Sequence, residues 1–147
     1  MKNKRLIGLG IVLAIILIVS IWWIMPKTFL NNVETESVEV IEVFDGNNGH
    51  RLQTTSRDDI SYIVSNIKNI KMKKEKIQLG MGTTYTLRFF DKSGKELDKF
   101  IINAPNIIIK GVIHYTCDNE LKEVMEYLID LENKAFPNDR VKWNENY

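Results

Sequence analysis

The sequence of 147 residues has only one cysteine, Cys117, and two histidines. A single cysteine cannot form an intrachain disulfide, so the folded part must be held together by its core. The chain also lacks the motifs of a phosphate-binding loop, a dinucleotide-binding turn, a nucleophile elbow and a zinc-protease helix. These absences argue against the enzyme classes that carry recognisable local signatures, and we expect no catalysis.

The chain has no large excess of positive charge. Three of its 20 Lys and Arg lie in the first five residues, which leaves 17 against 19 Asp and Glu in the remainder, a net charge of −2. A nucleic-acid-binding domain concentrates basic residues on one surface. The near-neutral balance therefore predicts no nucleic-acid partner.

Metal and cofactor sites also find little support. His50 lies far from His114 and Cys117 in the sequence, and a metal site needs three or four converging ligands. The turn at 45–49 resembles the start of a calcium loop, but Ser56 stands where the twelve-residue pattern needs an acidic side chain. We therefore predict no metal site and no cofactor.

One long apolar run is present, and it organises the rest of the chain. It covers residues 6–25, from Leu6 onward, and contains no charged residue. Twenty residues of helix measure about 30 Å, the thickness of a bilayer's hydrocarbon core. Because only a helix pairs all its own backbone groups in lipid, we predict a transmembrane helix that contacts the bilayer.

The flanks of this run predict its orientation. Lys2, Lys4 and Arg5 precede it, so the N-terminus should stay in the cytoplasm and the remainder should lie outside. Trp22 and Trp23 fall at its far end, where indole rings favour the headgroup region. A cleaved signal peptide is the alternative, but its shorter apolar core would end in small residues. We expect an uncleaved, single-pass anchor in the cell membrane.

Apolar periodicity and turn residues divide the remainder of the chain. Runs that alternate apolar and polar residues, or that are rich in β-branched and aromatic residues, predict strands at 36–44, 50–54, 83–90, 97–102 and 107–117. Two helices are predicted, one opened by Ser56 with the stripe Ile60, Ile63, Val64 and Ile67, and the other at 120–133. The fold class is therefore α+β, a small antiparallel sheet with two helices packed on one face.

The predicted segments are a cytoplasmic tail at 1–5, the transmembrane helix at 6–25, a polar stalk at 26–35, the extracytoplasmic domain at 36–136, and a polar tail at 137–147 that carries Trp143 and Tyr147.

A basic run follows the first of these helices. It consists of Lys68, Lys71, Lys73, Lys74 and Lys76. A solvated surface at a helix C-terminus accounts for such a run, because lysines there complement the helix dipole. The alternative is an interaction patch for anionic wall polymer or lipid headgroups.

His114 and Cys117 are the one pair that suggests catalysis. A cysteine just before a helix can have a lowered pKa, which would suit a thiol-dependent envelope enzyme. However, strand alternation places Tyr115 and Cys117 on one face and His114 on the other. We therefore predict a buried thiol and a surface histidine, and keep the Cys117 enzyme as the alternative function.

Several segments together resemble a known kind of domain. They are the turn DGNNG, the capped helix SRDDISYIVSNIKNIKMKK, the hairpin TTYTLRFFDKSGKEL, and IIIKGVIHYTC before the last helix. The region 38–128 is similar to a small extracytoplasmic domain of unknown function in Gram-positive bacteria, carried behind a membrane anchor or lipoprotein signal. The resemblance implies a location and a shape, and it offers no catalytic residues. We expect a binding or regulatory module of unknown ligand, with a membrane or envelope protein as its partner.

Overall fold

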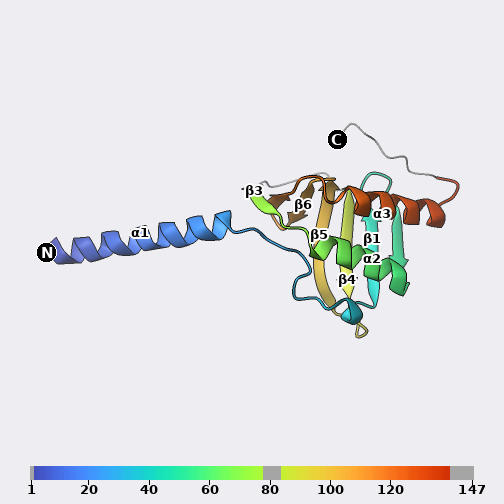
Figure 1. Ribbon diagram of the computed structural model, residues 1–147, viewed down its shortest axis with the longest axis horizontal. Helices are drawn as coiled ribbons and strands as arrows, with labels where there is room; N and C mark the ends of the chain where they lie inside the picture. The colour runs from blue at the N-terminus through green and yellow to red at the C-terminus, as the bar shows by residue number, and fades with distance from the viewer. Residues whose placement is uncertain (1, 78–83, 140–147) are drawn as a thin grey trace.

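The computed structural model describes residues 2–77 and 84–139, and the side chains from Ile7 onward. The first residue of the strand predicted at 83–90 and the tail residues Trp143 and Tyr147 lie outside these ranges. The apolar run forms helix α1, Lys2–Ile24, which includes Leu6 and carries Trp22 and Trp23 in its last turn. Its stretch Ile7–Ile24 has a mean hydropathy of 2.8 and no buried residue, so α1 is long and apolar enough to cross a membrane. Figure 1 shows α1 projecting from the rest of the protein as a separate rod.

The rest of the chain is an antiparallel sheet with two helices on one face, as the sequence predicts (Figure 1). The sheet has seven strands in the order β2-β1-β4-β5-β6-β7-β3. In chain order the strands are β1 Val40–Asp45, β2 Arg51–Thr54, β3 Lys73–Ile77, β4 Tyr85–Phe90, β5 Glu96–Ala104, β6 Ile107–Lys110 and β7 Ile113–Thr116. Helix α2 is Arg57–Lys68, α3 is Lys122–Ala135, and a 3-10 turn, η1, covers Thr35–Ser37.

The core lies between the sheet and the two helices. The predicted stripe of α2 is buried, and Ser56 caps the helix by accepting a hydrogen bond from the Asp59 backbone N–H at 3.4 Å. Helix α3 contributes Val124, Met125 and Leu128 to the core. The strands supply every second residue, so β4 buries Tyr85, Leu87 and Phe89 while its other side chains face away from the helices.

The segment at 26–35 is part of the fold, and its prediction as a polar stalk is wrong. Phe29, Leu30 and Val33 are buried, and the Phe29 ring packs against Phe100 and Tyr115 with centroids 5.3 and 5.0 Å away. Just before them, Lys27 and Met72 exchange two backbone hydrogen bonds of 2.7 and 2.9 Å. The end of α1 is therefore joined closely to the sheet edge.

The basic run does not lie at the end of a helix. Only Lys68 belongs to α2, whereas Lys73, Lys74 and Lys76 lie on β3, a strand that the sequence pattern does not reveal. The segment Lys73–Ile77 has no alternation of apolar and polar residues. It forms a strand because it pairs along β7, and long-range pairing of this kind leaves little trace in the local sequence.

Candidate functional site

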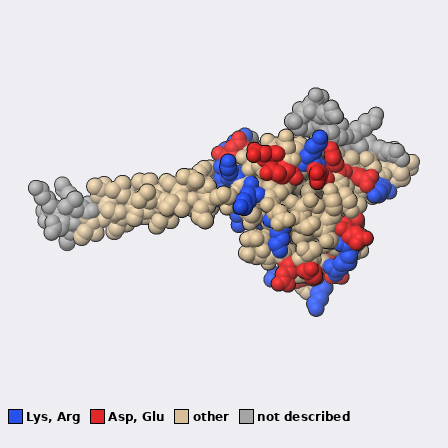
Figure 2. Space-filling model, in the orientation of Figure 1, with Lys and Arg blue, Asp and Glu red and all other residues tan. Residues whose placement is uncertain are grey.

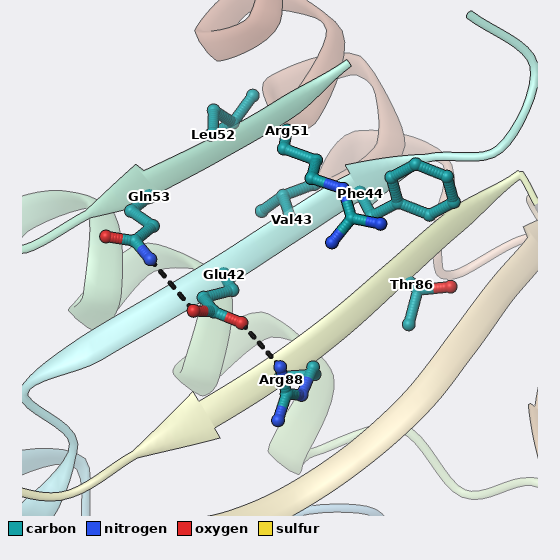
Figure 3. Close-up of a pocket in the computed structure, with 8 residues that line it drawn as sticks. All are labelled: Glu42, Val43, Phe44, Arg51, Leu52, Gln53, Thr86 and Arg88. Carbon is teal, nitrogen blue, oxygen red and sulfur yellow. Dashed lines mark hydrogen bonds and ion pairs between the residues drawn. The ribbon is translucent and has the colours of Figure 1, made fainter. Parts of the chain in front are cut away.

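One face of the sheet carries no helix, and a hollow of about 470 Å³ opens on it. In Figure 3 the side chains of Glu42, Gln53 and Arg88 stand in front of the sheet, and the helices lie behind it. Strand alternation explains this arrangement, because residues two apart on a strand share a face. The lining side chains on this face are Glu42 and Phe44 from β1, Arg51 and Gln53 from β2, and Thr86 and Arg88 from β4.

A set of hydrogen-bonded charges holds the floor of this hollow. Arg88 lies between two carboxylates, with its Nη1 2.8 Å from Glu42 Oε2 and its Nε 2.7 Å from Glu96 Oε2. The hydrogen bond to Glu96 and the charges of both carboxylates raise the pKa of Arg88 despite its partial desolvation. Gln53 donates a bond of 2.8 Å to the other oxygen of Glu42. Because these groups come from four adjacent strands, the arrangement is set before anything binds.

Arg51 differs from Arg88 in having no carboxylate partner among residues 7–77 and 84–139. It is exposed, and its guanidinium carbon lies 4.7 Å from the centre of the Phe44 ring. An aromatic ring beneath a guanidinium fixes the plane of the group and leaves its N–H donors free at the edge. Such a group is suited to bind a carboxylate or phosphate through two parallel hydrogen bonds.

The Cys117 thiol does not resemble an activated nucleophile. It is partly buried, and this burial, together with a hydrogen bond to Glu120, raises the pKa of the thiol to about 12. His114 is only 5% exposed, so the prediction of a surface histidine is wrong. Its strand lies between β6 and β3, where the Cα partners of His114 are Ile109 and Lys76.

The second histidine belongs to a polar cluster that the sequence analysis missed. His50 Nδ1 lies 2.7 Å from Glu132 Oε1, and its Nε2 lies 3.0 Å from Asp139 Oδ2. The other oxygen of Glu132 accepts a hydrogen bond of 2.8 Å from the Tyr85 hydroxyl, and the His50 ring stacks on Phe136 at 4.2 Å. Both imidazole nitrogens and both Glu132 oxygens thus have hydrogen-bond partners, and the cluster joins segments that are far apart in the sequence. Glu132 follows Leu128 by four residues and so lies on the apolar stripe of α3. A carboxylate at such a position is the one sign in the sequence of a buried polar contact.

The lysines of the basic run do not converge on one point. Lys68 donates a bond of 3.0 Å to the Val33 carbonyl, and Lys74 donates one of 2.5 Å to the carbonyl of Trp22 in α1. Lys71, Lys73 and Lys76 are exposed along the sheet edge. In the described part of the chain, no group of three or more His, Cys, Asp or Glu side chains is arranged to hold a metal ion.

Comparison with protein families, with curated protein sequences and with solved structures finds nothing that matches this chain. The similarity to the small extracytoplasmic domain of Gram-positive bacteria therefore stays a prediction. The function must be argued from the anchor helix and from the helix-free face.

Proposed function

We propose that this chain is a membrane-anchored, extracytoplasmic binding module whose helix-free sheet face docks a membrane or envelope protein. Helix α1 supports the anchoring, because its apolar stretch Ile7–Ile24 is long enough to span a bilayer and has no buried residue. Lys2, Lys4 and Arg5 before it favour a cytoplasmic N-terminus. With this topology the domain lies outside the cell, directly at the membrane.

The guanidinium of Arg51, which has no carboxylate partner in the described part of the chain, is the observation that carries the binding role. It lies on Phe44 at the side of a preformed polar hollow, while the neighbouring Arg88 already has two carboxylate partners. Protein interfaces are enriched in arginine and aromatic residues, and their strongest contacts are often of this type. We therefore expect the partner to place an Asp or Glu side chain against Arg51.

Photo-crosslinking of the full chain in its membrane tests this proposal. Benzoylphenylalanine at position 86 lies in the hollow, whereas the same residue at position 126 lies on the exposed side of α3. We expect an adduct with a membrane or envelope protein from position 86 and none from position 126. Equal adducts from both positions, or none above background, would contradict the proposal.

Charge reversal adds a matched control to the crosslinking. Arg51→Glu should weaken the adduct from position 86 about thirtyfold, since losing a dominant interface contact costs about 2 kcal/mol or more. Lys92→Glu changes the net charge equally in the turn between β4 and β5 and should leave the adduct unchanged. An adduct that is insensitive to Arg51→Glu would exclude the proposed acidic contact.

A further inference from the structure

The end of the sheet next to α1 carries a concentrated positive charge. The segment 71–77 contains Lys71, Lys73, Lys74 and Lys76 against Glu75 alone. Outside this segment, residues 26–147 hold 13 Lys and Arg against 18 Asp and Glu, a net charge of −5. Figure 2 shows basic side chains gathered where the domain meets α1. An anionic surface attracts the basic segment 71–77 and repels the remainder of the domain, which is negatively charged. The domain should therefore turn its β3 end toward such a surface.

Contacts between α1 and β3 fix where this edge lies. Lys74 Nζ donates a bond of 2.5 Å to the Trp22 carbonyl at the C-terminal end of α1, and lies 4.3 Å from the centre of the Trp22 ring. Lys27 and Met72 add two backbone hydrogen bonds a few residues further on. If α1 spans the bilayer, Trp22 lies at the headgroups, and these contacts hold β3 at the same depth.

An irregularity in β3 arranges its exposed lysines. Lys73 pairs with Thr116 and Lys76 pairs with His114, with a register shift between Lys74 and Lys76. Thr116 and His114 are two residues apart on β7 and so share a face, which places Lys73 and Lys76 on one face as well. In an unshifted strand, residues three apart would point to opposite faces. The shift therefore brings two lysines together that a regular strand would separate.

We propose that the lysines of this edge, Lys71, Lys73 and Lys76, bind the anionic phospholipid headgroups of the bilayer that holds α1. This inference rests on the membrane anchoring proposed above. Within the described part of the chain none of the three lysines forms an ion pair with a carboxylate, so their charge is available. Lysines on an edge strand also discourage pairing with another sheet, but that role does not depend on the charge of the lipid. Headgroup binding would hold the domain against the membrane and fix the direction in which its helix-free face points.

Nanodiscs that hold the full chain test this contact. A fluorophore on Ile77→Cys, in a Cys117→Ser parent, reports the depth of β3, because Ile77 is 62% exposed at the end of the strand. The discs contain phosphatidylcholine alone or with about 30% phosphatidylglycerol, and a lipid with a nitroxide headgroup serves as the quencher. We expect stronger quenching with phosphatidylglycerol, and we expect added salt to reduce the difference.

A triple variant and its matched control make the test specific. Lys71, Lys73 and Lys76 changed to Gln should lower the ratio of docked to undocked domain by roughly fivefold per lysine, and so about a hundredfold, in anionic discs. Lys92, Lys95 and Lys99 changed to Gln alter the charge equally on exposed positions of the β4–β5 hairpin and should have no such effect. Lys74 stays unchanged because it bonds to α1.

Four results would overturn the inference. Equal quenching in both lipid compositions, or an equal loss in both triple variants, would exclude specific headgroup binding. Added anionic wall polymer could protect the fluorophore from quenching while phosphatidylglycerol leaves the quenching unchanged. That result would show that the lysines bind the wall polymer and not the lipid. A chain that enters neither kind of disc would instead contradict the anchoring itself, and the inference would fail with it.

Discussion

The imidazole of His50 is hydrogen-bonded to the carboxylate of Glu132, with Nδ1 and Oε1 2.7 Å apart. The two residues are 82 positions apart in the sequence. Glu132 is fully buried, and the side chain of His50 is 13% exposed. This contact ties the turn between β1 and β2 to the last turn of α3. Because Tyr85 of β4 donates to the same carboxylate, one acidic side chain joins three separate elements.

Removing this carboxylate should destabilise the domain strongly. Glu132→Leu leaves the Tyr85 hydroxyl and His50 Nδ1 without their partner, so we expect the free energy of unfolding to fall by about 3 to 5 kcal/mol. Tyr85→Phe removes only one bond to a charged group and should cost about 1.5 to 3 kcal/mol. Guanidinium titration of the full chain in detergent measures both.

Glu126→Leu is the control for these variants. Glu126 is half exposed on the same helix, and its only ion pair in the described structure is 3.8 Å long, so its loss should change stability by less than about 0.5 kcal/mol. A Glu132→Leu protein as stable as this control would show that the cluster contributes nothing.

The contact also predicts a pH dependence. Desolvation lowers the pKa of His50, but the hydrogen bonds and charges of Glu132 and Asp139 outweigh it and raise the pKa above 6.5. A group that binds its proton more tightly when folded stabilises the fold fully below its unfolded pKa of 6.5 and loses this effect as pH rises through the folded value. The stability difference between wild type and His50→Gln should therefore be largest below about pH 6.5 and shrink above it. An NMR titration midpoint for His50 below 6.5, or a difference that grows with pH, would disagree with this.

Cys117 should react slowly. Burial and the bond to Glu120 raise the pKa of the thiol to about 12, so almost none of it is thiolate at neutral pH. We expect alkylation by iodoacetamide to be much slower in the native protein than in guanidinium. A native thiol that reacts faster than the unfolded one would favour the thiol-dependent enzyme.

Charges in the middle of α1 should prevent membrane insertion. Each charged residue at the centre of a spanning helix costs about 2.5 to 3.5 kcal/mol, so Ile15→Lys with Ile16→Lys should cost about 5 to 7 kcal/mol. Cell fractionation should find this variant outside the membrane fraction. Neutral residues in place of Lys2, Lys4 and Arg5 should leave insertion intact and weaken only the orientation.

Those features of the fold that depend on local physics were predictable from the sequence. The apolar stripe of α2 repeats at helical spacing, and Ser56 precedes it as a cap. Gly94 and Gly111 mark hairpin turns and have φ values of +79° and +63°, which favour glycine. The fold class, the helices and most of the strands can be predicted from such local signals.

Features created by distant partners could not be read in this way. Strand β3 has an almost wholly charged sequence and exists because β7 lies beside it. Phe29, Leu30 and Val33 stand among polar residues and become core only through contact with distant strands. The hollow is lined by residues from three strands whose order in the sheet differs from their order in the chain. Local periodicity carries no information on such neighbours, so the hollow could not be predicted. The carboxylate of Glu132 on the apolar stripe of α3 signals a buried polar contact, but it does not identify His50 and Tyr85 as the partners.

Protease treatment of intact protoplasts tests the central claim, an anchored domain on the outer face of the membrane, most directly. A full chain with tags at both ends is produced in a Gram-positive host and followed in the membrane fraction. The account predicts that the part beyond residue 26 is digested from outside while the N-terminal tag stays protected and membrane-bound. A domain protected from protease inside the cell, or a chain released after cleavage near Met25, would contradict it.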